Sequence, residues 1–512
     1  MPVLEQLRLV VQVCSEPNRS TNPPRSMHAI SAGEDAIQIA RQSFLANTDT
    51  HFTKGGKKRS QSPSASSHPS SFRVRQQDPN LQMACGRPRE VEETIPLTLL
   101  YPAFGQFIDD SQSCTYIPTE EDNNFIGSLA HVMSAMYENE DQRREAVSKV
   151  LNGYNIRLSL NGKVRGTRYI TDGNMSMTVD DRCHPYVIVE FKNETAGSGS
   201  EPYIQAAMYY LQATRTYAAT LSGSALPCFL LIIFGPTIVF ASAVWTLRPV
   251  IQILSTPISF NFHSLDRYNH VTAVRHMAAF RKAVQTLETH YQTLPHHSEL
   301  VSKLSHPTIF PYPTTFTSLD DNSTIAFKYM EHFHENGQQS KRLIFFGTLN
   351  EGDAQVPICI KFVQEYSRDA HIHCAAAGLA PKLRGFEQLP GGWYMVVMDR
   401  LIGYDQLADV AIGEQIPKSV FDRLGDCLRS LHSDKLVHGD IRDTNIMLKT
   451  VDRTNIMIID FDWAGVEGVV RYPAFVNYKD IQRPDDARDG QHIKAAHDEA
   501  MLGFLMAKRS QK

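Results

Sequence analysis

The chain has 512 residues, a formal net charge of −4 at pH 7 and eight cysteines. Its length allows two or three domains, each with its own core. The balanced charge excludes a global basic field for nucleic acid or an anionic membrane, and the cysteines form no C-x-x-C pair that would indicate a zinc site or a disulfide scaffold.

The first 92 residues lack the pattern of a folded domain. Residues 1–46 are expected to be a weakly ordered arm, in which Glu5 and Arg8 interrupt an apolar stretch that is therefore a poor secretory signal. Residues 47–92 are rich in Ser, Pro, Lys, Arg and Gln, and we expect a disordered linker there. Its basic cluster at 54–59 fits either a solvated linker or a nuclear import signal. We therefore expect an intracellular protein, cytoplasmic or nuclear.

Residues 93–300 have the pattern of an α/β domain with mixed strands and flanking helices. The longest apolar tract, residues 228–245, approaches the length of a membrane span but carries Gly235-Pro236 at its middle. Two buried strands joined by a turn are the favoured interpretation, and no membrane partner is expected. Helices are predicted at 125–151, 201–215 and 269–292, and further strands at 169–171, 176–179, 186–191 and 249–254.

A set of polar residues in this domain has the spacing of a metal-dependent hydrolytic site. Asp172 begins a strand-turn-strand pattern, and Glu190 and Lys192 end it on one face, because strand side chains alternate with a period of two. Gln205 and Tyr209 follow one turn apart on a helix. Asp172 and Glu190 could bind one or two Mg²⁺ ions while Lys192 orients the attacking water.

This order of residues resembles the PD-(D/E)xK nuclease superfamily, in particular its members with a trailing Gln-x-x-x-Tyr motif. The resemblance implies a restriction-endonuclease-like fold and makes DNA a candidate partner. Asp180 and Asp181 are alternative first carboxylates, although they also fit a turn beside Pro185. The competing interpretation is a polar strand end on an exposed hairpin, because the motif is short.

Residues 305–512 are expected to form a second domain, with strand patterns first and helical patterns later. Strands at 343–347 and 356–362 should pair around a turn at 350–353, another strand covers 393–398, and a helix covers 419–433. Lys361 lies at the end of the second strand. A kinase has at this place the lysine that contacts the α- and β-phosphates of ATP.

An acid, an amide and a second acid in this domain have the order that phosphoryl transfer from ATP requires. Asp440 is the expected proton acceptor for the incoming hydroxyl, and Asn445 and Asp460 are the expected Mg²⁺ ligands. Arg442 is expected to stabilise the transferring phosphoryl group. Strand patterns at 445–448 and 455–459 predict a hairpin that delivers Asp460.

Two further parts of a nucleotide site are predicted with less regular motifs. Met398 begins the connector between the lobes, against which adenine would pack. The helix after Lys361 contains no Glu, so Asp369 is the best replacement for the usual acidic partner of the lysine, with Glu365 as the runner-up.

The domain also departs from a conventional kinase. Gly347, together with Gly352, is only a weak substitute for the glycine-rich loop that covers the phosphates. Asp462 stands where Gly usually follows Asp-Phe, which removes backbone freedom. Few residues follow Asp460 and no Ala-Pro-Glu segment occurs, so the C-lobe is expected to be shortened. These departures leave a pseudokinase as the alternative.

Four stretches of this domain resemble fungal-type protein kinases and the wider aminoglycoside-phosphotransferase-like branch, which also use His-Gly-Asp. They are residues 378–383, 391–398, 438–445 and 471–498, and the resemblance spans residues 305–505. It implies a bilobal kinase-like fold and the phosphorylation of a protein Ser or Thr hydroxyl with ATP and Mg²⁺. In that reaction Asp440 would accept the proton, and Asn445 and Asp460 would bind the metal.

The two halves together are similar to fused fungal Crinkler-type proteins, although the usual targeting motif of those effectors is not recognisable and secretion is not inferred. The predicted fold class is a restriction-endonuclease-like α/β domain followed by a bilobal, α+β protein-kinase-like domain with a shortened C-lobe. Three functions stay open. They are a kinase-like phosphotransferase with a nuclease-like module, a Mg²⁺-dependent nuclease regulated by a pseudokinase, and a non-catalytic interaction protein on two degenerate enzyme folds.

Overall fold

The chain divides into two units, residues 1–312 and residues 313–512, in the computed structural model. The division lies a few residues beyond the expected boundary at 300–305. The structure describes residues 37–48, 62–91, 95–164, 167–179, 181–194, 199–221, 224–293, 310–335, 338–339, 342–412, 414 and 416–510. The predicted basic cluster at 54–59 and most of the predicted arm lie outside the described residues.

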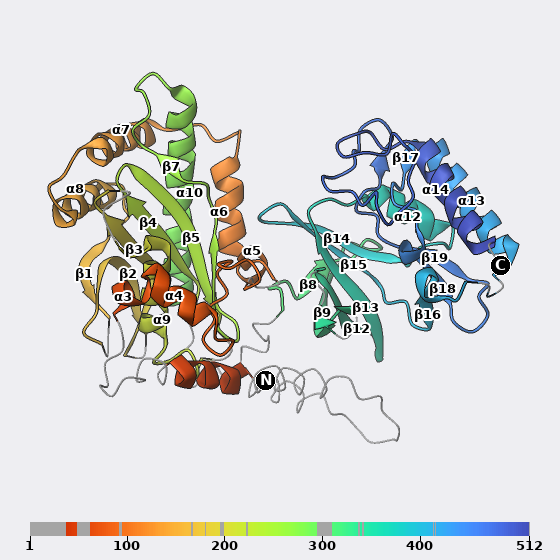
Figure 1. The fold of residues 1–512 in the computed structure, drawn as a ribbon, viewed down its shortest axis with the longest axis horizontal. Helices are drawn as coiled ribbons and strands as arrows, with labels where there is room; N and C mark the ends of the chain where they lie inside the picture. The colour runs from red at the N-terminus through yellow and green to blue at the C-terminus, as the bar shows by residue number, and fades with distance from the viewer. Residues whose placement is uncertain are drawn as a thin grey trace. The chain divides into compact units, whose positions relative to one another are not determined.

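The first unit is built on a seven-stranded sheet with the order β1-β2-β3-β4-β5-β6, in which β7 pairs with β5 (Figure 1). Neighbouring strands are antiparallel except β3 and β4, which are parallel and joined through helix α9. The strands are β1 Ser159–Lys163, β2 Ile170–Val179, β3 Arg182–Lys192, β4 Cys228–Phe234, β5 Thr237–Trp245, β6 Pro249–Ile253 and β7 Ile258–Ser259.

The apolar tract of residues 228–245 forms two strands, as predicted. β4 and β5 pair antiparallel around Gly235, whose φ of 51° is a left-handed conformation that glycine adopts without strain. Both strands are buried over almost their whole length, because helices cover both faces of the sheet. No helix in the described part of the chain has the length and apolar character that crossing a membrane requires.

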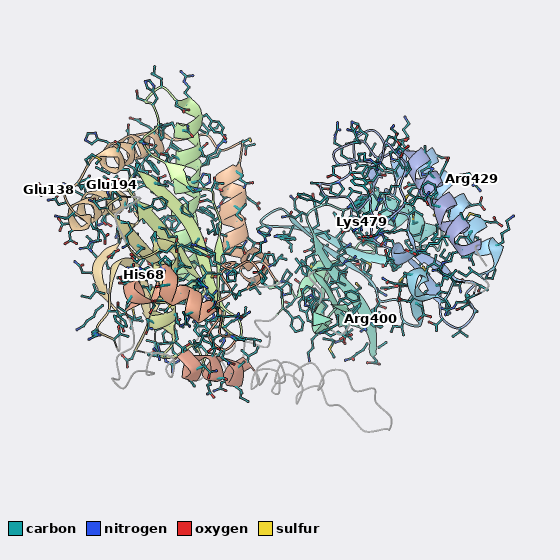
Figure 2. All side chains as sticks on the ribbon, viewed as in Figure 1. His68, Glu138, Glu194, Arg400, Arg429 and Lys479 are labelled. Carbon is teal, nitrogen blue, oxygen red and sulfur yellow. The ribbon has the colours of Figure 1, made fainter. Side chains whose placement is uncertain are left out.

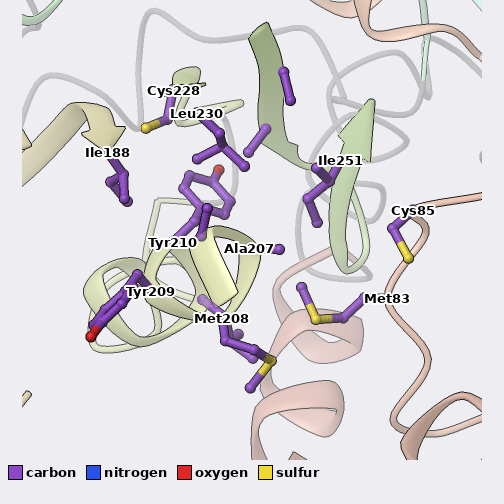
Figure 3. Close-up of a cluster of buried hydrophobic side chains, with 14 of the residues drawn as sticks. Met83, Cys85, Ile188, Ala207, Met208, Tyr209, Tyr210, Cys228, Leu230 and Ile251 are labelled. Atoms are coloured by element: carbon purple, nitrogen blue, oxygen red, sulfur yellow. The ribbon is translucent and has the colours of Figure 1, made fainter. Parts of the chain in front are cut away.

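Helices pack on both faces of this sheet. Leu230 of β4 lies in a buried cluster with side chains of α9, shown in Figure 3, whereas its neighbour Phe229 contacts Phe280 of α10 and Phe104 of α6. Successive strand residues thus face opposite helix layers. The labelled helices of the unit are α3 Pro63–Ser66, α4 Pro69–Gln76, α5 Leu97–Leu100, α6 Pro102–Gln112, α7 Glu120–Ser134, α8 Glu140–Gly153, α9 Pro202–Thr214 and α10 Arg267–Gln292. Residues 37–48 are helical as well.

The prediction of a single helix at 125–151 is wrong, because the two helices α7 and α8 occupy this region. The backbone is extended at Ala135, where α7 ends, and α8 starts after Asn139. The side chain of Asn139 accepts a hydrogen bond from Gln142 N at 3.0 Å, which satisfies a free donor at the new helix start. Likewise, the strands predicted at 169–171 and 176–179 are one continuous strand, β2.

Part of the predicted disordered linker is folded. Residues 62–91 contain α3 and α4, and they pack against α9 with Phe72 and Met83 buried. The side chain of Gln76 accepts a hydrogen bond from Met83 N at 2.9 Å and donates one to Met83 O at 3.0 Å. Composition predicted disorder because large apolar residues are few, but those present are placed to bury against the sheet unit.

The second unit begins with an antiparallel six-stranded sheet of order β14-β15-β13-β12-β9-β8. The predicted pairing of the strands that flank residues 350–353 is confirmed as β12 and β13. The strands are β8 Thr315–Thr317, β9 Thr324–His332, β12 Ile344–Glu351, β13 Ala354–Val363, β14 Leu383–Leu389 and β15 Trp393–Asp399, and a separate pair consists of β10 His334–Glu335 and β11 Gln338–Gln339.

The rest of the second unit is mainly helical. A buried cluster joins Leu424 and Leu428 of α13 to Met501 and Leu505 of α14, while Arg429 of α13 is exposed (Figure 2). This spacing of apolar residues is the reason that α13 forms as predicted. The elements are α12 Arg368–Ala376, β16 Tyr404–Gln406, α13 Lys418–Ser433, β17 Leu436–Val437, β18 Ile446–Lys449, β19 Ile456–Ile458, β20 Gly465–Val466 and α14 Ala495–Ser510, with 3-10 turns at Leu407–Asp409 and Asp443–Asn445.

Candidate functional site

The loop that carries Asp440 is fixed to helix α14. Asp498 of that helix is fully buried, and its carboxylate accepts hydrogen bonds from His438 N and Gly439 N, each at 2.8 Å. Gly439 has a φ of 82°, and a Cβ at this position would meet Ile493 Cδ1 at 2.9 Å. Glycine is therefore required here, and Asp498 holds the backbone just before Asp440 in place.

Asp440 is almost fully buried and surrounded by hydrogen-bond donors. Asn445 Nδ2 donates to its Oδ2 at 2.8 Å and to its backbone oxygen at 3.0 Å. Arg442 Nε lies 2.9 Å from Oδ2, and Arg483 Nη2 donates to Oδ1 at 2.6 Å. The structure thus brings together the predicted residues Asp440, Asn445 and Arg442, and it adds Arg483.

A hairpin delivers Asp460 to the same place. β18 and β19 pair as predicted, and Ile459 N donates to Asn445 O at 3.0 Å, which joins the two loops directly. Asp460 has a φ of 71°, a left-handed conformation that is rare for residues other than glycine and that is found at functional sites. Its Oδ1 accepts a hydrogen bond from Lys361 Nζ at 2.5 Å.

Lys361 contacts two carboxylates. Its Nζ also lies 2.5 Å from Asp462 Oδ1, and the Lys361 side chain is only 11% exposed. Burial alone lowers the pKa of Lys361, but the charges of Asp460 and Asp462 outweigh burial and raise it. Burial raises the pKa of Asp460, yet Lys361 outweighs it and holds that pKa below the ordinary range. Burial and the neighbouring Asp460 raise the pKa of Asp462.

The predicted partner of Lys361 on helix α12 is not at the site. Asp369 is exposed in the first turn of α12, and the runner-up Glu365 is exposed as well. The carboxylates that contact Lys361 in the described part of the chain are those of Asp460 and Asp462. The prediction failed because it assumed that the acidic partner comes from the helix, whereas here the loop that follows β19 supplies it.

Gly347 and Met398 lie in the sheet of the second unit. Gly347 is inside β12 and not in a turn, and a Cβ there would meet Lys328 O of β9 at 2.5 Å. This close approach of two strands explains the glycine without a phosphate-covering role. Met398 is buried on β15, opposite Cys359 of the strand that carries Lys361. That Met398 begins the connector between the lobes stays a prediction.

The first unit brings together the five predicted nuclease-like residues. Lys192 Nζ lies 2.5 Å from Glu190 Oε1, and Asp172 Oδ2 accepts a hydrogen bond from Phe191 N at 2.9 Å. Gln205 and Tyr209 lie on α9, which packs against β3. Burial raises the pKa of Tyr209, and the charges of Glu190 and Asp172 raise it further. Asp181 lies at the far end of the β2–β3 hairpin, and Asp180 lies outside the described residues.

Two residues at this site were missed by the sequence analysis. Glu140 Oε2 in the first turn of α8 lies 3.5 Å from Lys192 Nζ, and Arg144 Nη1 lies 3.4 Å from Asp172 Oδ1. Glu140 follows a helix cap, but an acidic residue at a helix start is common and gives no specific signal. Burial, followed by the charge of Asp172, raises the pKa of Glu190 well above its ordinary value.

Both sites contain side-chain oxygen atoms that suit Mg²⁺, but the two sites differ in whether these oxygens already have partners. In the first unit, Glu190 Oε2 and Gln205 Oε1 are buried without a hydrogen-bond partner among the described residues, and a bound cation would satisfy them. In the second unit, Asp460 and Asp462 converge on one ammonium group. No group of three or more His, Cys, Asp or Glu side chains arranged for a metal occurs in the described part of the chain. Mg²⁺ sites commonly use one or two carboxylates together with substrate phosphates.

Comparisons with known proteins add the following. No model of a protein family and no curated protein matches the chain. Among solved structures, the Cydia pomonella granulovirus kinase PK-1 matches with 15% sequence identity and a TM-score of 0.27, over 36% of this chain and 69% of that chain. Vaccinia related kinase 3 matches with 17% identity and a TM-score of 0.29, over 39% of this chain and 68% of that chain. Both are kinases; the assignment of function rests on the residues of the site.

Proposed function

We propose that the second unit is an ATP- and Mg²⁺-dependent kinase-like phosphotransferase that acts on Ser or Thr hydroxyls of a protein. The observation that supports this most strongly is the convergence of Lys361 with Asp460, and of Asp440 with Asn445, through direct contacts. Lys361 and Asp460 are 99 residues apart in the chain, so their contact is a product of the fold. These are the four residues that phosphoryl transfer requires.

Each of these side chains has a defined task in the reaction. Asp440 accepts the proton of the acceptor hydroxyl, and the amide of Asn445 holds the Asp440 carboxylate in position. Lys361 moves from the two carboxylates to the α- and β-phosphates when ATP binds, and Arg442 faces the transferring phosphoryl group. Asp460 and Asn445 would hold magnesium, which would supply the positive charge that neutralises the phosphates.

The finer features of this assignment are part of the proposal. We place the adenine against the connector that begins at Met398, and we assign the unit to the fungal-type branch of kinase-like proteins on the motif that runs from His438 to Asn445. The protein works inside the cell, in the cytoplasm or the nucleus.

Label transfer from γ-labelled ATP tests the kinase proposal. Purified full-length protein is incubated with Mg²⁺ and a generic basic protein, and wild type is compared with Asp440→Asn and Asp440→Ala. We expect both variants to lose transfer by about 100-fold or more while binding of ATP is retained. Asp480→Asn, which removes an exposed acid of the same unit, is the matched control and should transfer normally. Transfer that is unchanged in Asp440→Asn would show that the base is assigned wrongly.

A second candidate function, a Mg²⁺-dependent nuclease in the first unit, is favoured by one specific observation. Glu190 Oε2 is buried without a hydrogen-bond partner among the described residues, although its other oxygen contacts Lys192. A buried carboxylate oxygen without a partner is costly, and a bound cation would offset that cost. In this role Asp172 and Glu190 bind the metal, Lys192 orients the attacking water, and DNA is the substrate.

DNA cleavage assays with the same preparations test the nuclease. Lys192→Ala and Glu190→Gln should abolish Mg²⁺-dependent cleavage, whereas Asp440→Ala should leave it intact. Lys163→Ala is the matched control, because Lys163 is an exposed lysine of the same sheet. Absence of both activities in folded protein that still binds nucleotide or a partner would favour the third possibility, a non-catalytic interaction protein.

A further inference from the structure

A buried arginine reaches the proposed base from a distant part of the second unit. The side chain of Arg483 is 1% exposed, and its Nη2 donates a hydrogen bond to Asp440 Oδ1 at 2.6 Å. The two residues are 43 positions apart in the chain. A lone arginine in a polar loop gives no sequence signal for such a role, so only the structure identifies it.

The guanidinium of Arg483 also lies over an aromatic ring. Its Cζ lies 5.1 Å from the ring centre of Trp463, which directly follows Asp462. The Nε and Nη1 groups of Arg483 are buried without a hydrogen-bond acceptor in the described part of the chain. The ion pair with Asp440 and the contact with the ring of Trp463 therefore offset the cost of burying this charge.

The segment that carries Arg483 is tied to the same helix as the catalytic loop. The hydroxyl of Tyr472 contacts His497 Nδ1 at 3.1 Å, and Ile493 N donates to Val470 O at 3.0 Å. His497 precedes Asp498, which holds the backbone in front of Asp440. Residues 470–493, the catalytic loop and the start of α14 thus belong to one network of contacts.

We propose that Arg483 is a positioning residue for Asp440, a role that rests on the proposed kinase function. Oδ2 of Asp440 accepts a hydrogen bond from Asn445 and forms an ion pair with Arg442, and among the described residues Arg483 is the donor that fixes Oδ1. With both oxygens fixed, the carboxylate cannot rotate, and a free lone pair keeps one direction towards the acceptor hydroxyl. Arg483 thereby makes the geometry of the base depend on the segment 470–493.

The competing explanation is that Arg483 only stabilises the fold through a buried ion pair. The two roles differ in which kinetic constant changes. A positioning residue affects the proton-transfer step, so loss of Arg483 should lower kcat while KM for ATP and the affinity for a non-hydrolysable ATP analogue stay the same. A residue with a purely structural role lowers the fraction of folded protein and leaves kcat per folded site unchanged.

Steady-state kinetics of Arg483→Met and Arg483→Lys test the role in the full-length protein, with active sites counted by titration with the ATP analogue. We expect Arg483→Met to lower kcat per site by about 100-fold. The KM of this variant for ATP should stay within about twofold of the wild-type value. Arg483→Lys keeps the charge and should recover part of kcat even if Arg483→Met folds poorly. Arg488→Met is the matched control, since Arg488 of the same segment also pairs with an Asp and lies over a Tyr ring but is exposed.

The outcomes separate the inference from the function on which it rests. Equal kcat per site in wild type and both Arg483 variants would overturn the positioning role and leave the kinase in place. A loss of kcat in Arg483→Met that Arg483→Lys partly restores would support the role. Absence of transfer by the wild type would overturn the kinase function and this role together.

Discussion

The ammonium of Lys361 lies as close to Asp462 as to Asp460, with 2.5 Å from Nζ to one carboxylate oxygen of each. A conventional kinase pairs this lysine with an acid on the helix that follows it, which in this chain would be on α12. Here the acid two residues beyond Asp460 takes that place. Asp462, which stands where kinases usually have Gly, therefore supplies a negative charge that pairs with Lys361.

This arrangement predicts the stability of Lys361 variants. Lys361→Met should lower the free energy of unfolding of the second unit by about 2 kcal/mol, because two partly buried carboxylates would face each other without a cation. The measurement is urea unfolding. Adding Asp462→Asn should recover roughly half of the loss, since the double variant keeps only one carboxylate. Lys382→Met, which removes an exposed ion pair with Asp320, should cost less than about 0.5 kcal/mol.

Arg41 predicts a second effect on stability, in the first unit. It is fully buried, and its guanidinium donates five hydrogen bonds to backbone oxygens. Arg41→Lys should lower the free energy of unfolding by about 3 kcal/mol or more, because an ammonium group cannot reach several carbonyls at once and leaves them unsatisfied. Thermal unfolding of the variant measures this loss. An unchanged midpoint would mean that these hydrogen bonds do not hold the helical residues 37–48 against the rest of the unit.

His371 predicts a dependence of stability on pH. Its Nε2 donates to Pro381 O at 2.8 Å and its Nδ1 accepts from Tyr366 Oη at 2.7 Å, so the neutral ring is fully bonded, and burial lowers its pKa to about 4. The unfolded state therefore binds more protons between that value and the ordinary pKa of about 6.5. Stability should be complete above about pH 6.5 and fall towards pH 4, by at most about 1.4 kcal/mol per pH unit from this group.

The pH effect is measured by urea unfolding at several pH values. His371→Gln removes the titrating group and should flatten the curve in this window. A slope that persists unchanged in His371→Gln would assign the effect to other groups.

A side chain at position 439 should disturb the catalytic loop and lower phosphoryl transfer. Gly439→Ala should lower phosphoryl transfer by at least about tenfold, because its new Cβ would meet Ile493 and displace the backbone of Asp440. Gly468→Ala is the matched control: Gly468 has a similar φ of 79°, but open space surrounds its Cβ position. Label transfer and thermal unfolding of both variants measure the two effects. Equal losses in both would mean that backbone strain, and not the contact with Ile493, decides the outcome.

Short-range patterns in the sequence were sufficient for several features of this protein. The turn at Gly235 between β4 and β5 and the hairpin that delivers Asp460 both involve residues close in the chain. Their geometry follows from alternation, turn residues and fixed spacing, which a sequence displays directly. The same holds for the placement of Glu190 and Lys192 on one face of β3.

Contacts between distant segments could be decided only by the tertiary structure. Asp462 in place of Asp369 as the partner of Lys361, Arg483 on Asp440 and Glu140 beside Lys192 each depend on which faces of separate elements pack together. Composition likewise predicted disorder for residues 62–91, because it averages over a segment. It does not show that a few apolar side chains, such as Phe72 and Met83, are buried against α9. Local spacing thus determined which functional groups each loop carries. Packing against distant elements determined which charged side chains lie beside those groups.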